Sequence, residues 1–305
     1  MQPVIELLSA QPGAFVAVVI AFALLVGSFL NVVIHRLPIM MNREWAAQCA
    51  EFTADAADRG PATSTEKTQS YNLVVPRSAC PSCGHNITAL QNIPIISYLL
   101  LRGRCAGCKA PISARYPLIE AFTAAAAGYV AWHFGFGAEA LAAIVLTFVL
   151  IALSAIDIDT QFLPDAIVLP TLWLGLILSL FHPLEGAQTL FVAPPEAIVG
   201  AAAGYLSLWS VYQLFKLLTG KEGMGYGDFK LLALLGAWLG WEKLPLIILL
   251  SAVVGAVVGV SLIVFRRQGR DVPIPFGPYL AAAGWIAMLW GDQIIAGYLG
   301  YVGLG

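Results

Sequence analysis

Two aspartates and four cysteines are the residues of this chain whose types and spacing could do chemistry. Asp228 follows three glycines in the stretch Gly223-Met-Gly-Tyr-Gly-Asp228-Phe-Lys230, and Asp157 ends a long apolar run. An ionisable group at the border of an apolar segment is costly to keep, so each aspartate is a candidate functional residue. Glycine lets another backbone approach closely, as a bound peptide would. The alternative is a cytoplasmic turn that carries a solvated aspartate.

The two aspartates together suggest peptide hydrolysis. Asp157 and Asp159 are about 200° apart around a helix, so they cannot face the same partner. Asp157 is nearer the apolar run and is expected to pair with Asp228, whereas Asp159 is expected to face water. Two carboxylates held close together share one proton. The ionised one would activate a water molecule against an amide carbonyl, and the protonated one would bind that carbonyl and assist departure of the amine.

Two other acids are expected to be structural. Asp165 follows Pro164 and precedes an apolar helical run, which is the place of a helix N-cap. Glu120 lies just inside an apolar segment. It could neutralise Arg115, belong to a site or stabilise the helix end, and we favour a structural role.

The cysteines form two C-x-x-C pairs that are separated by 21 residues: Cys80, Cys83, Cys105 and Cys108. This spacing is typical of a zinc ribbon, in which each pair presents two thiolates to one ion. Four thiolates leave no open position on zinc, so the site is expected to be structural. A redox-active pair of dithiols is the alternative, but the reducing cytosol favours metal. Cys49 has no such partner and is expected to be an apolar filler.

The composition is that of a membrane protein that crosses the bilayer several times. The chain has 305 residues, of which 59% are hydrophobic and 11% charged, whereas soluble domains carry about 25% charged residues. The net charge of −2 gives no reason to expect a nucleic-acid partner. We expect an all-α protein with about eight transmembrane helices and a small cytoplasmic zinc-ribbon-like domain. The predicted spans lie near 14–34, 117–134, 139–156, 166–182, 196–218, 229–240, 244–265 and 275–290.

The arrangement of positive charge predicts the orientation of these spans. With the N-terminus outside, 15 of the 16 basic residues fall in inside loops, and only Lys243 does not. This asymmetry favours that orientation and places both Asp157 and Asp228 at the cytoplasmic face. No basic residue precedes the first apolar run, which is therefore expected to be a membrane span and not a signal peptide.

The predicted spans divide the chain into three regions. Residues 1–34 hold the first span, 35–116 a cytoplasmic loop domain with the four cysteines, and 117–305 a transmembrane core. Within the loop domain, 42–70 is expected to be a flexible insert with a short amphipathic helix near 45–52. Small residues recur four apart in the core and are expected to pack helices closely: Gly200 with Gly204, Gly236 with Gly240, and Gly255 with Gly259.

Taken in order, the motifs resemble those of the type IV prepilin peptidase family of membrane aspartic proteases. The resemblance covers nearly the whole chain. The matching motifs are Gly27-Ser-Phe-Leu-Asn31, His35-Arg36-Leu-Pro38, the C-x-x-C pairs, Arg102-Gly103-Arg104-Cys105, Arg115 to Glu120, Asp157 to Asp165, Gly225-Tyr-Gly-Asp228 and Pro275-Phe-Gly-Pro278. The insert 42–70 departs from a compact family loop but touches no motif.

The resemblance implies a function. Such enzymes remove the basic leader from prepilins and from pseudopilins of type II secretion, at the inner face of the bacterial inner membrane. Members with the long loop also methylate the new N-terminus with S-adenosylmethionine. By resemblance, Asp157 and Asp228 are catalytic, and Gly103 and Arg104 belong to the stretch associated with methyl transfer. The alternatives are a proton-coupled transporter and a non-catalytic secretion-assembly protein, and the sequence does not indicate the oligomeric state.

Overall fold

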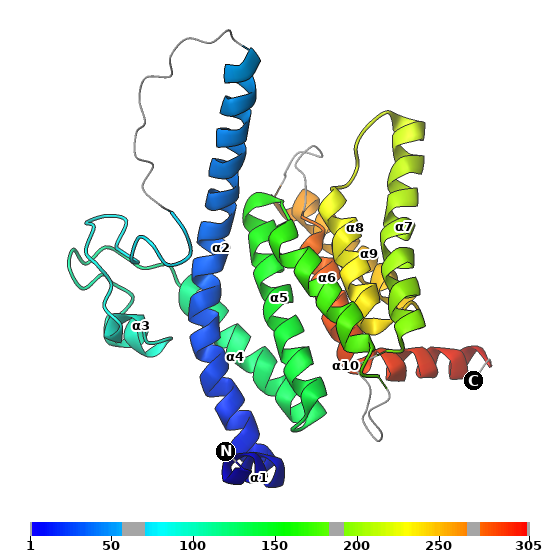
Figure 1. Ribbon diagram of the computed structural model, residues 1–305, viewed down its shortest axis with the longest axis horizontal. Coiled ribbons are helices and arrows are strands. Elements are labelled where there is room, and N and C mark those ends of the chain that lie inside the picture. Colours follow the sequence, from blue (N-terminus) through cyan, green and yellow to red (C-terminus); the bar gives the residue numbers. More distant parts are fainter. Residues whose placement is uncertain (1, 57–70, 183–191, 267–274, 304–305) are drawn as a thin grey trace. The chain divides into compact units, whose positions relative to one another are not determined.

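The computed structural model describes residues 2–56, 71–182, 192–266 and 275–303 (Figure 1). Within these ranges the chain is helical and contains only isolated β-bridges, which confirms the all-α prediction. The elements are α1 Gln2–Ala10, α2 Pro12–Ala56, η1 Leu90–Asn92, α3 Ile96–Leu100, α4 Arg115–Phe134, α5 Ala138–Thr160, α6 Asp165–Ser179, α7 Pro194–Thr219, α8 Tyr226–Leu239, α9 Leu244–Arg266 and α10 Gly277–Val302. They form two compact units, one of residues 1–20 and 126–305 and one of residues 21–125.

Every predicted span falls on a helix, but eight spans are not confirmed. Among the described residues, five helices are long and apolar enough to cross a membrane: Pro12–Phe52, Ala138–Thr160, Pro194–Thr219, Leu244–Leu262 and Gly277–Val302. The helices α6 and α8 have only 15 and 14 residues. At 1.5 Å per residue they are about 21–23 Å long. They are therefore shorter than the roughly 30 Å of bilayer hydrocarbon.

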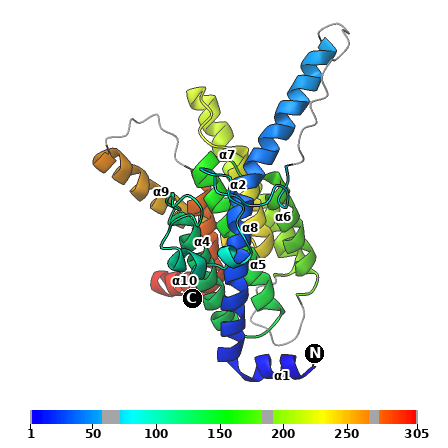
Figure 2. The ribbon, with the colours of Figure 1, turned by 90° about the vertical axis from the view of Figure 1, so that its left-hand side faces the viewer.

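Helix α8 is the central helix of the larger unit. It contacts α6, α7, α9 and α10, and Figures 1 and 2 show it among these helices. Its residues from Asp228 to Leu239 are buried, with the exception of Lys230, which is partly exposed. A helix that is apolar on all sides needs such an enclosed position. This arrangement holds Asp228 inside the bundle at the start of α8.

Glycines bring α7 and α8 together backbone to backbone. A Cβ atom on Gly236 would collide with the carbonyl group of Gly200, and a Cβ atom on Gly200 would collide with that of Gly236. Gly204 lies against the backbone of Leu232 in the same way. The prediction of close packing is confirmed at Gly200, Gly204 and Gly236, whereas Gly255 makes only ordinary contacts with aromatic side chains. On its other side α8 is joined to α6, because the indole Nε1 of Trp238 donates a hydrogen bond to the Thr171 carbonyl oxygen at 2.8 Å.

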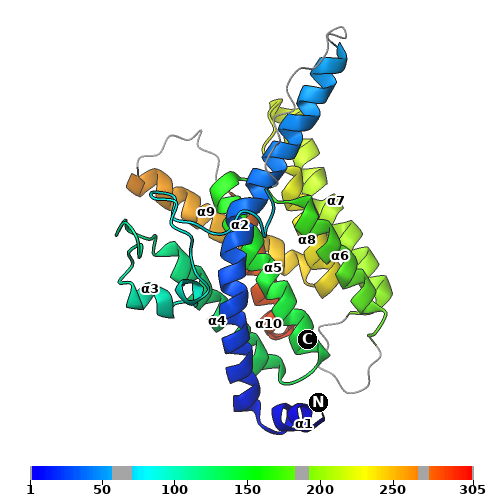
Figure 3. The ribbon, with the colours of Figure 1, turned by 60° about the vertical axis from the view of Figure 1, so that its left-hand side comes forward.

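The smaller unit contains most of α2, which is longer than predicted. The helix does not end near Ile34 but continues through Pro38 to Ala56 (Figure 3). The helix predicted near 45–52 is present as part of α2, and the described part of the predicted insert, residues 42–56, is helical. The charge of Arg36 does not end the helix because its buried guanidinium donates hydrogen bonds to the carbonyl oxygens of Asn72 and Pro76, at 2.9 and 2.6 Å. The rest of the predicted insert, 57–70, lies outside the described residues.

Glu120 joins the loop domain to α4. Its buried Oε2 accepts a hydrogen bond from the Ile95 N–H at 2.8 Å, where Ile95 has a positive φ of 60°. Helix α2 packs against the same turn of α4, since a Cβ atom on Gly27 would lie 2.9 Å from the Glu120 Cα. The side chain of Asn31 also donates to the Tyr116 carbonyl oxygen at 3.2 Å. The structural role predicted for Glu120 is confirmed.

Candidate active site and metal centre

Asp157 lies in the last turn of α5, and its side chain is only 4% exposed. The helix ends just after it, because Gln161 adopts the left-handed conformation and donates its N–H to the Asp157 carbonyl oxygen at 2.8 Å. The side-chain Oδ2 accepts a hydrogen bond from the N–H of Gly277 at 3.0 Å. Gly277 is the first residue of α10, so the free N–H groups and positive dipole of that helix end stabilise a carboxylate there.

Asp228 lies in the first turn of α8 and is 8% exposed. Extended backbone at Gly225 leads into this turn, and the Asp228 N–H donates to the Gly225 carbonyl oxygen at 3.3 Å. Gly227 is needed for packing, since a Cβ atom there would lie 2.9 Å from the Cβ of Leu163. The glycines of this motif thus allow the chain to turn into α8 against a neighbouring segment.

The surroundings of the two aspartates meet at Leu163. Leu163 fills the space between their neighbours, because a Cβ atom on Gly277 would lie 3.3 Å from its Cδ1. Asp157 is also close enough to Asp228 for their negative charges to interact. An acid pair in a buried position can hold one proton between its members and can act as combined general acid and base.

The neighbouring acids have separate positions. Asp159 is exposed, as predicted from its place on the helix. Asp165 is not the N-cap of α6, which is Pro164 without a side-chain cap. Instead, Asp165 accepts hydrogen bonds from Lys230 Nζ on α8, at 2.8 Å to Oδ1 and 2.7 Å to Oδ2. The N-cap prediction was wrong because it took into account only the local sequence and not a lysine 65 positions away.

Gly277 and Lys230 are the residues at this site to which the sequence analysis assigned no role. Gly277 lies in the Pro275-Phe-Gly-Pro278 motif, and Lys230 lies two positions after Asp228. In the sequence, each residue could have been recognised by its position within one of these motifs. A backbone N–H carries no residue-specific signature, so the hydrogen bond from Gly277 to Asp157 follows only from the fold.

The four predicted cysteines come together in the smaller unit. Their sulfur atoms all lie within 4.8 Å of one another, with 3.8 Å between Cys80 and Cys108 and 4.0 Å between Cys83 and Cys105. Sulfur atoms that bind a tetrahedral zinc ion at about 2.3 Å are about 3.8 Å apart. The geometry therefore fits a four-thiolate metal centre.

Each cysteine pair lies in the same kind of turn. In the first, Cys80 donates its N–H to the His85 carbonyl oxygen and accepts the Gly84 N–H. In the second, Cys105 does the same with Ala110 and Lys109. The corresponding residues Gly84 and Lys109 both have positive φ, 70° and 62°. The repeat shows that local backbone geometry positions these four thiols.

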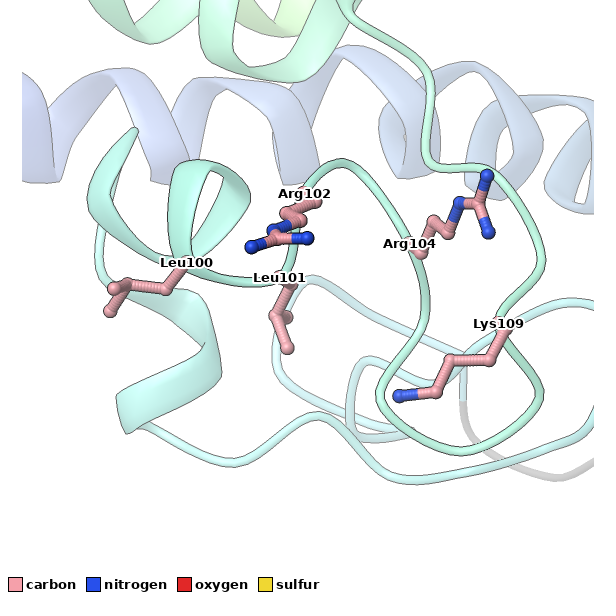
Figure 4. Close-up of a pocket in the computed structure, with 5 residues that line it drawn as sticks. All are labelled: Leu100, Leu101, Arg102, Arg104 and Lys109. Carbon is pink, nitrogen blue, oxygen red and sulfur yellow. The ribbon is translucent and has the colours of Figure 1, made fainter.

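Gly103 and Arg104 immediately precede the second turn. Gly103 has a φ of 67°, and a Cβ atom on it would lie 2.9 Å from the hydroxyl oxygen of Tyr98. Arg104 lines a surface cavity of about 480 Å³ together with Leu100, Leu101, Arg102 and Lys109 (Figure 4). The positive φ and the close approach to Tyr98 thus favour glycine at position 103. Arg104 is one of three basic residues that line the pocket.

The sequence matches two family profiles. Residues 21–134 match the bacterial peptidase A24 N-terminal domain, and residues 144–260 match the type IV leader peptidase family. No solved structure is significantly similar to the chain.

Three curated relatives carry the name prepilin leader peptidase/N-methyltransferase. The protein from Stutzerimonas stutzeri is 56% identical over the whole of both chains. The one from Pseudomonas aeruginosa is 56% identical over 99% of both. The one from Burkholderia pseudomallei is 50% identical over 95% of this chain and 90% of its own. With this similarity along its length, the chain belongs to the type IV leader peptidase family.

Proposed function

We propose that this chain removes the leader peptide from type IV prepilins and type II secretion pseudopilins with Asp157 and Asp228, and methylates the new N-terminus. Peptidase and methyltransferase activity follow from the family and from the names of its relatives. These names give no support to a transporter or a non-catalytic assembly protein. The observation that supports the residue assignment is that both aspartates are buried, on different helices, and that Gly227 and Gly277 beside them both lie against Leu163.

In the proposed reaction one aspartate acts as the general base and the other as the general acid. The ionised carboxylate takes a proton from a water molecule as the water oxygen attacks the scissile carbonyl carbon. The protonated carboxylate donates a hydrogen bond to the carbonyl oxygen and then supplies a proton to the departing amine. The Gly277 N–H fixes one oxygen of Asp157, which orients the carboxyl group for this transfer.

The four cysteines are proposed to hold one structural zinc ion. Their number, sulfur type and mutual distances fit tetrahedral zinc. An ion bound by four thiolates has no open position, so its role is to join the two turns at Cys80–Cys83 and Cys105–Cys108.

Gly103 and Arg104 are proposed to serve methyl transfer, as the family resemblance implies, and S-adenosylmethionine would supply the methyl group. Because Gly103 has no side chain, Tyr98 can pack closely against it, and this contact holds the loop that carries Arg104. The arginine could bind a carboxylate of the methyl donor by a charge-assisted hydrogen bond.

The membrane arrangement follows the charge distribution. The apolar helices and the family indicate an inner-membrane protein. We propose that its N-terminus is outside and that the aspartates lie at the cytoplasmic face, where a basic leader would be attracted to an acidic site.

The test is incubation of the purified protein with a synthetic prepilin, with and without S-adenosylmethionine, followed by mass measurement. The expected products are the mature peptide alone without the methyl donor and the mature peptide plus one methyl group with it. An unchanged substrate mass in both reactions would contradict the proposal, and cleavage without methylation would contradict its second half.

A further inference from the structure

The loop domain has an unbalanced positive charge. Residues 71–119 contain no acidic residue but five basic ones: Arg77, Arg102, Arg104, Lys109 and Arg115. Three of them, Arg102, Arg104 and Lys109, line the pocket beside the second cysteine turn (Figure 4). None of these three forms an ion pair with another residue that the structure describes. Such a pocket favours an anionic partner with several negatively charged oxygens.

Large apolar side chains lie exposed next to this pocket. Leu100, which lines it, is 79% exposed, and Leu99 is 67% exposed. Ile96, on the same short helix, is 56% exposed. Removing such side chains from water is favourable. The partner must therefore offer apolar contacts beside its negative charges.

The start of α4 fixes where this surface lies. The Ile95 N–H just before α3 donates to Glu120 within α4, five residues after the helix begins at Arg115 (Figure 3). The sequence predicts that α4 enters the membrane at residue 117. The hydrogen bond therefore holds α3 beside the first turns of α4, at the predicted start of that span.

We propose that Arg102 and Lys109 bind the phosphate groups of anionic phospholipids while Leu99 and Leu100 enter the acyl region beneath them. Cations attract anionic headgroups, and apolar residues beside them bury into the interface. The basic leader of a prepilin does not fit this surface, because like charges repel. The proposal adds a membrane contact to the proposed enzyme and does not depend on either of its activities.

A spin label at position 100 would test this contact in the full chain. The variant carries Leu100→Cys and Cys49→Ser, is loaded with zinc, and is placed in vesicles of phosphatidylcholine alone or mixed with phosphatidylglycerol. In the mixed vesicles we expect the label to collide mainly with oxygen, which concentrates in lipid, and little with a water-soluble nickel complex. In phosphatidylcholine alone we expect the reverse.

The native Cys49 provides a control label, since it is exposed on α2. It lies 15 residues beyond the predicted end of the first span at Ile34, which is about 22 Å along a helix. It should remain accessible to the nickel complex in both lipids. Bound zinc and retained prepilin cleavage would show that each labelled protein is folded.

A charge variant tests the role of the cations. Arg102→Gln with Lys109→Gln should reduce the equilibrium constant for membrane insertion of the label at 100 by about 30-fold in mixed vesicles, at about 1 kcal/mol for each cation near the surface. Glutamine is not β-branched, so it adds little strain at these positive φ values of 53° and 62°. A label that stays in water in both lipids, or that enters both equally, would overturn the proposal.

Discussion

The aspartate site and the cysteine cluster differ in how the fold assembles them. The four thiols lie on two copies of one turn, between Cys80 and Cys108. The aspartate site combines the end of α5, the start of α8 and the start of α10, and its hydrogen bond from Gly277 to Asp157 joins residues 120 positions apart. The cluster therefore depends on local backbone geometry, whereas the aspartate site depends on the packing of distant helices.

The largest expected effect comes from removing one of the paired charges. Asp157→Asn and Asp228→Asn should each reduce prepilin cleavage by about 10²- to 10⁴-fold, because an amide cannot exchange the required proton. Zinc content should stay unchanged, since the cysteine cluster does not share residues with the aspartate site. Cleavage is measured by mass and zinc by atomic absorption.

Glu139→Gln is the matched control for these variants. It also removes one carboxylate from α5, but at the first turn of the helix, far along the chain from Asp157. Cleavage by this variant should equal that of the unchanged protein. If Asp157→Asn cleaved equally well, the acid pair would not be the catalytic group.

The second test displaces Asp157 without changing its charge. A Cβ atom on Gly277 would lie 2.6 Å from Asp157 Oδ2, so Gly277→Ala must move the carboxyl group or the start of α10. We expect a loss of about 10²-fold in kcat, as for a misplacement of about 1 Å. Gly297→Ala on the same helix is the control, since its Cβ meets nothing within 4 Å. Equal rates for both variants would argue against positioning by Gly277.

Breaking the cysteine cluster should affect methylation but not cleavage. Cys105→Ser is expected to weaken zinc affinity at least tenfold. Loss of a residue that only orients a metal ligand already costs about that much, and Cys105 is itself a proposed ligand. The loop at Gly103 and Arg104 adjoins this turn, so methylation should fall with zinc occupancy while cleavage is retained. The assay supplies mature peptide for methylation and prepilin for cleavage. A parallel loss of both activities would show that the two sites are not independent.

The smallest expected effect concerns the ion pair between α6 and α8. The side chains of Lys230 and Asp165 are 29% and 48% exposed, so solvent screens their attraction. Lys230→Met or Asp165→Asn should lower cleavage by about two- to fivefold, as expected for partly exposed pairs. The exchanged pair, Lys230→Asp with Asp165→Lys, should recover part of the loss. If the exchanged pair recovered no cleavage activity, the attraction between these two side chains would not contribute to cleavage.

The same contrast explains what the sequence could predict. The cysteine cluster follows from spacing alone, because both turns are local. Asp157 and Asp228 could be paired from their place at the ends of apolar runs, and hydropathy indicated the helices. The hydrogen bond from Gly277 and the ion pair between Asp165 and Lys230 could not be predicted, because they join residues 120 and 65 positions apart.

The length of α2 shows a second limit. A basic pair and a proline after an apolar run normally indicate the end of a helix, but here the buried Arg36 is bound by carbonyl groups of residues 72 and 76. Those partners lie beyond the segment that was predicted to be a flexible insert. A local signal for a helix end was thus outweighed by hydrogen bonds to residues 36 and 40 positions further along the chain.

The close backbone contact between α7 and α8 limits how a substrate can enter. At Gly200 and Gly236 the two backbones touch directly, and nearer Asp228 the rings of Tyr205 and Tyr212 on α7 pack against Phe229 on α8. The hydrogen bond from Trp238 on α8 to Thr171 on α6 joins α6 to the same block of helices. We expect these three helices to move as one piece. A lipid-embedded pilin segment would then have to reach the aspartates from the side of α9 and α10, the neighbours of α8 that do not belong to this block.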